Sequence, residues 1–206
     1  MSIEIVPVVC GLLEENAYIV AVRGRQDCVI VDPGDDLEKL RRALGQRRLG
    51  AILLTHGHFD HTLAAGFLAE ETGAQVYLAE GDVEMLDDPE LNAFRLSMGD
   101  AEMKTVEVET QDYGDTLSVC GIEFEILPTP GHSRGSVCLY LKQEGILFSG
   151  DTLFRAGYGR MDLYGGDVRD MLNSLKRLFK LPPELTVYPG HGAPTTIGEE
   201  RARYRL

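Results

Sequence analysis

The sequence predicts a mixed α and β protein, and three observations carry that prediction. Short β-rich runs bounded by turn residues recur in both halves of the chain. Each half also contains segments whose apolar residues recur at helical spacing. No linker-like stretch divides the halves, and 206 residues suit one domain with a sizeable core. We therefore expect residues 1–206 to form a single domain.

The first half is expected to begin with strands and to continue with alternating strands and helices. β-rich runs cover residues 3–9, 17–22, 28–31, 51–54 and 75–78. A helix is expected from Asp35 or Asp36 to about Gly45, because three leucines in that stretch share one face: Leu37, Leu40 and Leu44. A second helix is expected over residues 62–72.

Residues 80–99 have a helical pattern that Pro89 interrupts. We interpret this segment as a helical hairpin packed on the sheet. The alternative is a cover over a functional cleft that supplies an apolar wall for a substrate.

The second half is expected to be mainly strands, over residues 106–108, 116–119, 122–127, 136–141, 146–148 and 185–188. Asp167 is expected to open a helix with apolar residues at helical spacing, and residues 197–204 to form a short closing helix.

The composition excludes several classes of protein. A net charge of −13, from 33 acidic and 20 basic residues, argues against a nucleic-acid surface and favours simple solubility. No run is long enough to cross a membrane, and the N-terminus lacks the features of a signal peptide. The four cysteines are scattered without a C-x-x-C pair, so we expect no disulfide framework and a cytoplasmic location: Cys10, Cys28, Cys120 and Cys138. Three of them lie in apolar, strand-like runs, where buried thiols are expected.

The most informative stretch lies between the run at 51–54 and the helix expected after it. His56, His58, Asp60 and His61 fall within six residues, on what reads as a loop between a strand and a helix. Neutral imidazoles and a hard carboxylate are ligands that suit zinc or iron. This loop is therefore predicted to bind metal.

Three more candidate ligands lie in similar turns elsewhere. His132 and His191 each follow a Pro-Gly pair after an expected strand, and Asp151 follows a glycine after another. These two histidines and the three in the loop are all the histidines of the chain. Asp32, at the end of the run 28–31, is expected to support the metal loop and not to bind metal itself.

The pattern His-x-His-x-Asp-His, followed by a Pro-Gly-His turn, a Gly-Asp turn and a late Gly-His, resembles the metallo-β-lactamase superfamily. Val31-Asp32-Pro33-Gly34 is similar to its early strand-end motif. Gly150-Asp151-Thr152-Leu153-Phe154 and Pro189-Gly190-His191-Gly192 resemble the glyoxalase II branch, the hydroxyacylglutathione hydrolases, in a short bacterial form. The resemblance implies a four-layer αββα sandwich with the ligand turns at one edge.

The resemblance also implies a set of roles. His56, His58 and His132 would bind one divalent metal ion, Asp60, His61 and His191 the second, and Asp151 would bridge the two. Zinc is preferred, with iron or manganese as alternatives. A metal-bridging hydroxide would attack an acyl carbon, while Asp60 orients it and accepts its proton. The implied activity is hydrolysis of a small-molecule thioester.

A Gly-rich loop at residues 154–162 carries the candidate substrate contacts Arg160 and Tyr158. A basic residue near position 160 helps to hold glutathione in glyoxalase II, although a solvated surface loop explains the same residues. We expect no C-terminal glutathione-binding helical domain, which puts glutathione specificity in doubt.

Other activities remain open. A persulfide dioxygenase would bind a single iron through His56, His132 and Asp151. A lactonase and a non-catalytic metal-binding scaffold are further alternatives. Antibiotic hydrolysis is disfavoured, because true β-lactamases of this type lack the bridging aspartate. The sequence does not fix the oligomeric state.

Overall fold

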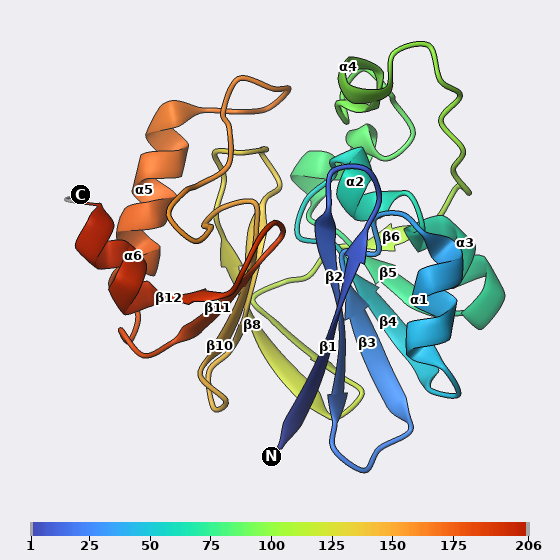
Figure 1. Cartoon of the computed structure of the whole chain (residues 1–206), viewed down its shortest axis with the longest axis horizontal. Coiled ribbons are helices and arrows are strands. Elements are labelled where there is room, and N and C mark those ends of the chain that lie inside the picture. Colours follow the sequence, from blue (N-terminus) through green and yellow to red (C-terminus); the bar gives the residue numbers. More distant parts are fainter. Residues whose placement is uncertain (1, 205–206) are drawn as a thin grey trace.

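The computed structural model describes residues 2–204, and within them two six-stranded sheets pack face to face. Helices cover the outer face of each sheet (Figure 1), so the layers run helix, sheet, sheet, helix. The predicted four-layer αββα sandwich is confirmed.

The first sheet has the order β1-β2-β3-β4-β5-β6. Its first three strands pair antiparallel and β3 to β6 pair parallel. The strand bounds are β1 Ile3–Cys10, β2 Glu15–Val22, β3 Asp27–Val31, β4 Arg48–Leu53, β5 Gln75–Tyr77 and β6 Thr110–Gln111. Because β3 and β4 run parallel, Asp32 and the metal loop follow their strands at the same edge of the sheet.

The second sheet has the order β12-β11-β10-β9-β8-β7, antiparallel except for the parallel pair β10 and β11. The bounds are β7 Thr116–Val119, β8 Ile122–Pro128, β9 Val137–Leu141, β10 Ile146–Gly150, β11 Thr186–Pro189 and β12 Thr195–Thr196. His132, Asp151 and His191 follow β8, β10 and β11, respectively. These three strands therefore deliver their turns to one end of the sandwich.

Three apolar clusters hold the layers together. One lies between the sheets and includes Phe124, Leu139 and Phe148. A second lies under α1 (Leu37–Leu44) and α3 (Ala65–Thr72). A third lies under α5 (Val168–Leu178) and α6 (Ile197–Arg203). Burial of this apolar surface, at roughly 25 cal/mol per Å², is the main force that stabilises the sandwich.

The helix expected over residues 62–72 is instead two helices, α2 (Phe59–Thr62) and α3. The break is caused by a contact with a segment that is distant in the sequence. The Ala64 amide donates to the carbonyls of Pro33 and Gly34, both at 3.1 Å, and not to the preceding helical turn. The loop after β3 thus competes with helix formation at this point.

Two further expectations were wrong. Residues 106–108 form no strand. Their chain instead runs over α3, where a Cβ at Gly66 would lie 2.0 Å from the Val106 carbonyl oxygen. Residues 80–99 form no helical hairpin but a 3₁₀ helix, η1 (Glu80–Met85), and the short α4 (Phe94–Met98). Ala93, at a φ of 67°, turns the chain between them.

Within residues 2–204, no helix is both long enough and apolar enough to span a bilayer. All four cysteines carry free thiols, and Cys10, Cys28 and Cys138 are buried as expected.

Candidate metal centre

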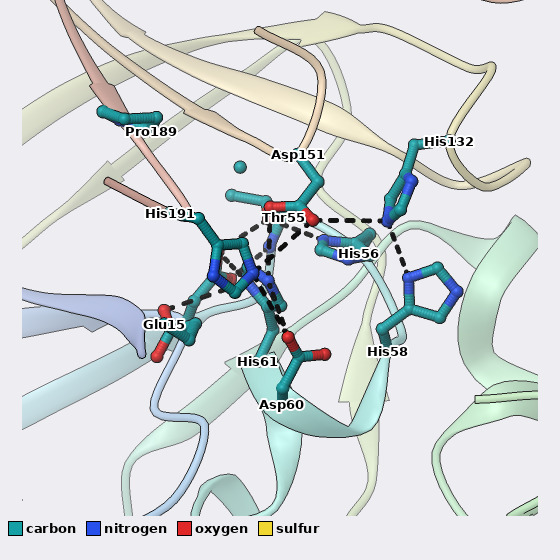
Figure 2. Close-up of polar contacts among 12 residues, drawn as sticks. Glu15, Thr55, His56, His58, Asp60, His61, His132, Asp151, Pro189 and His191 are labelled. Atoms are coloured by element: carbon teal, nitrogen blue, oxygen red, sulfur yellow. Dashed lines mark hydrogen bonds and ion pairs between the residues drawn. The ribbon is translucent and has the colours of Figure 1, made fainter. Parts of the chain in front are cut away.

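Four turns bring the predicted ligands together at one end of the sandwich (Figure 2). The ligand atoms of His56, His58 and His132 lie within 4.8 Å of one another, and this set is called the first group. The ligand atoms of Asp60, His61 and His191 meet the same limit and form the second group.

Asp151 lies between the two groups. Its Oδ1 is 3.3 Å from His61 Nε2, and its Oδ2 is 3.5 Å from His132 Nε2 and 3.7 Å from His191 Nε2. One carboxylate thus faces both groups, as a bridging ligand must.

Asp32 orients two of the histidines from behind. Its carboxylate accepts hydrogen bonds from the Thr55 amide and hydroxyl, both at 2.7 Å, and lies 3.0 Å from His61 Nδ1. Because the Thr55 proton is given to Asp32, His56 Nδ1, 3.1 Å from the Thr55 Oγ1, must be the donor of that contact. Asp32 therefore fixes the ring orientation of His56 and His61, the supporting role that was expected of it.

Backbone carbonyls orient two other rings. His132 Nδ1 donates to the Arg160 carbonyl at 2.7 Å, and His191 Nδ1 donates to the Leu13 carbonyl at 3.0 Å. With Nδ1 as the donor in each, the Nε2 atoms of these histidines are directed into the site. His58 differs, since its Nδ1 faces His132 Nε2 at 2.8 Å.

The donor set fits divalent metal ions. His56 Nε2, His61 Nε2 and Asp151 Oδ1 are buried without a hydrogen-bond partner. Unsatisfied buried polar atoms cost about 1–3 kcal/mol each, and a bound cation would satisfy all three. Imidazole nitrogens with carboxylate oxygens, and no thiolate, suit zinc, iron or manganese.

The two groups differ in charge. Burial lowers the pKa of His56 well below its ordinary value and that of His58 to about 3, so both rings are neutral and ready to bind a cation. Burial also acts to lower the His61 pKa, but Asp151 and Asp60 outweigh it and hold that pKa well above its ordinary value. A proton and a metal ion therefore compete for His61 Nε2.

Asp82 connects the two halves of the site, and no sequence pattern predicted this role. This buried side chain in η1 accepts hydrogen bonds from the Gly57 amide at 2.9 Å, the Ser133 hydroxyl at 2.5 Å and the Gly135 amide at 2.6 Å. Gly57 lies in the metal loop, whereas Ser133 and Gly135 follow His132. Asp82 therefore fixes the position of the loop that carries His58 relative to the turn that carries His132.

Glu15 is a second residue that sequence reasoning missed. Its carboxyl is fully buried, neither oxygen has a hydrogen-bond partner, and Oε1 lies 3.8 Å from His61 Nδ1. Burial raises its pKa well above the ordinary value. The next residue, Asn16, donates to the carbonyls of Pro189 and Gly192 and so holds the turn that carries His191.

A cleft of about 230 Å³ opens over the ligands. Arg160 lines it, with its guanidinium donating to Asp162 at 2.7 and 2.8 Å. Tyr158 is not among the lining residues, and its ring packs against Tyr204 with centroids 5.6 Å apart. Substrate binding by either residue stays a prediction. Ala93, Leu96 and Ser97 line the same cleft, which supports the alternative reading of residues 80–99 as a cover.

Comparison with known proteins shows a family match and several relatives of similar sequence. The metallo-beta-lactamase superfamily profile matches residues 10–191. The probable metallo-hydrolase YqgX of Bacillus subtilis is 36% identical, over 93% of this chain and 91% of its own length. The hydroxyacylglutathione hydrolase GloC of Haemophilus influenzae is 31% identical, over 98% of this chain and 95% of its own length.

Several solved structures are similar to this chain in fold and in sequence. BLEG-1, described as a B3 metallo-beta-lactamase, has a TM-score of 0.89 at 36% identity and covers 97% of both chains. TTHA1623 in a di-iron-bound form has a TM-score of 0.84 at 38% identity, over 96% of this chain and 97% of its own. ETHE1 from Myxococcus xanthus has a TM-score of 0.73 at 29% identity, over 96% of this chain and 81% of its own. The chain belongs to the metallo-beta-lactamase superfamily.

Proposed function

We propose that this protein is a dinuclear metal-dependent hydrolase of thioesters, similar to the glyoxalase II branch of the superfamily. The observation that carries the proposal is the position of Asp151, whose two oxygens face His61 on one side and His132 on the other. A single carboxylate that lies between two groups of candidate ligands could bridge a pair of metal ions, which supports a two-metal site. The similarity to GloC supports the thioester as the substrate.

Seven side chains would hold the ions: His56, His58, Asp60, His61, His132, Asp151 and His191. Two divalent ions at this site would supply Lewis acidity and a water activated for attack at neutral pH. Zinc is the proposed metal, and the di-iron form of TTHA1623 supports iron as the alternative.

Asp60 is the proposed proton acceptor. Its carboxylate lines the cleft, and Oδ2 lies 3.2 Å from His191 Nε2. Burial alone would raise its pKa, but His61 and His191 outweigh that effect and keep it below the ordinary value. Asp60 is therefore ionised at neutral pH and able to accept a hydrogen bond from the attacking water. In the reaction a C–O bond forms, the C–S bond breaks, and the proton taken from water passes to the leaving sulfur.

One specific observation favours a second candidate. His56, His132 and Asp151 together form a two-histidine, one-carboxylate set, which is typical of mononuclear iron oxygenases. The likeness to ETHE1 supports the same reading. A persulfide dioxygenase is therefore the alternative to the hydrolase.

The test loads the protein separately with zinc and with iron. Each form is then assayed for thiol release from S-D-lactoylglutathione and simple acyl thioesters, for oxygen uptake with glutathione persulfide, and for hydrolysis of a lactone and a cephalosporin. Thioester turnover by a form that holds about two ions per chain supports the proposal. Oxygen uptake by a form with about one iron, without thioester turnover, overturns it in favour of the dioxygenase.

A further inference from the structure

The walls of the metal cleft are apolar, whereas its floor is made of ligands. We propose that this cleft binds the acyl chain of an apolar thioester, and that Leu13 and Leu96 determine this specificity. The inference rests on the proposed function and adds the substrate class to it.

The lining separates into two kinds of side chain. Candidate ligands form the floor: His58, Asp60, His132, Asp151 and His191. Most of the remaining lining residues are apolar: Leu13, Phe59, Ala93, Leu96, Phe154 and Leu163. If the carbonyl of an acyl group lies at the floor, next to the candidate ligands, its alkyl chain would therefore contact the apolar side chains of the walls.

Two of these wall residues leave apolar surface in water. Leu13, in the turn between β1 and β2, is 42% exposed, and Leu96, on α4, is 65% exposed. Figure 1 shows that this turn and α4 lie at the same end of the molecule, at the top of the view. A bound acyl chain would cover both side chains, and removal of apolar surface from water favours binding.

As far as the structure describes their residues, the walls of the cleft offer no unpaired cation to a charged thiol. Arg160 is the one Lys or Arg among the lining residues that the structure describes, and its guanidinium is already paired with both oxygens of Asp162. Glutathione brings two carboxylates, and coenzyme A brings phosphates. The thiol portions of common biological thioesters are polar or charged. The acyl group is therefore the part of the substrate that matches the apolar walls.

The size of the cleft agrees with this assignment. Pockets that enclose drug-sized ligands measure roughly 300–1,000 Å³. At about 230 Å³ this cleft holds only part of a thioester. The acyl chain would fill it, while the thiol extends beyond the rim.

The experiment measures kcat/KM of the metal-loaded protein for acetyl, butanoyl, hexanoyl and octanoyl thioesters of N-acetylcysteamine, an uncharged thiol, and for S-D-lactoylglutathione. We expect kcat/KM to rise by about two- to fourfold per methylene until the cleft is full. We also expect the longer thioesters to exceed lactoylglutathione. Binding of matched 2-oxoalkyl thioethers, which cannot be hydrolysed, is measured in parallel and should show the same dependence on chain length.

Matched variants locate the effect. Leu13→Ser and Leu96→Ser should each lower the ratio of kcat/KM for the octanoyl thioester to kcat/KM for the acetyl thioester by about tenfold, the effect of losing one good apolar contact. Leu12→Ser and Met98→Ser are the controls. Leu12, 75% exposed, adjoins Leu13, and Met98 shares α4 with Leu96, but neither lines the cleft.

The outcomes separate the two proposals. Chain-length-dependent binding of the thioethers without hydrolysis of any thioester overturns the proposed function and retains this inference. Thioester hydrolysis that is flat across the series, or that falls equally in the Leu13 and Leu12 variants, overturns the inference and retains the function. Neither hydrolysis nor thioether binding overturns both.

Discussion

The two ligand groups share a site but differ in construction. The first group consists of three buried imidazoles, with no carboxylate of its own. The second combines Asp60 with two histidines and reaches solvent, since the His191 side chain is 27% exposed and that of Asp60 14%. Burial drives the His56 and His58 pKa values down, whereas carboxylates drive those of His61 and His191 up.

This difference assigns the groups different tasks. In the first group, His56 and His58 present neutral nitrogens to a cation with little competition from protons, which suits this group to retain an ion. In the second group, the raised pKa values of His61 and His191 strengthen the competition between protons and a metal ion, and Asp60 and His191 line the cleft. The second group is therefore suited to metal exchange, to substrate binding and to proton transfer.

The largest effect is expected from the first group. His58→Ala should lower the metal content and reduce thioester hydrolysis by about 10³-fold or more, because several kcal/mol of transition-state stabilisation depend on the ions. The fold should survive, since the sandwich core lies apart from this ring. Metal analysis, turnover and circular dichroism check these points. Full activity in this variant would refute the site.

A smaller loss is expected from the second group. His191→Ala should release about one ion per chain, retain the ion of the first group and reduce turnover by about 10²-fold. Stepwise titration of the metal-free variant, compared with His58→Ala, measures the difference. Loss of both ions in His191→Ala would show that the two groups do not bind independently.

Substitution of Asp82 tests whether metal binding by the first group depends on the hydrogen bonds that Asp82 accepts. Asp82→Ala leaves the Gly57 and Gly135 amides unpaired, so the free energy of unfolding should fall by about 3 kcal/mol. Metal affinity should fall about 10- to 100-fold, the usual effect of losing an outer-shell partner. Denaturant unfolding and competition with a chelator measure the two quantities. Asp82→Asn, which keeps one acceptor oxygen, should lose less of each, and equal losses would contradict the positioning role.

The smallest effect concerns Glu15 and depends on pH. Its folded pKa is raised above the ordinary 4.5, so the native chain keeps a proton there that the unfolded chain loses as pH rises through that value. Stability from this group is therefore present at low pH and falls as pH rises. In the metal-free protein, Glu15→Gln should raise the free energy of unfolding by about 1–2 kcal/mol at pH 8 and change it little at pH 4. Chemical denaturation at both pH values decides this, and a variant that is less stable at pH 8 would contradict it.

The ligand turns could be predicted because they depend on local sequence. Each candidate ligand comes soon after a strand, and the segment after β4, a loop that continues into α2, carries four of the seven candidates itself. The fold class followed from resemblance, since periodicity alone indicated only mixed α and β structure.

The missed features depend on contacts between distant residues. Asp82 acts through Ser133 and Gly135, and Glu15 through His61, and neither pairing leaves a local pattern. The break before α3 arises from the carbonyls of Pro33 and Gly34. Residues 106–108 have the composition of a strand, but their position over α3 prevents pairing with β5.

We propose that both ligand groups bind metal and that together they hydrolyse thioesters. The most direct test measures the metal content of the purified protein and its thioester turnover in the same sample. We expect about two zinc-like ions per chain and thioester turnover that disappears with chelation. About one iron per chain, with oxygen uptake on a persulfide and no thioester turnover, would contradict the account.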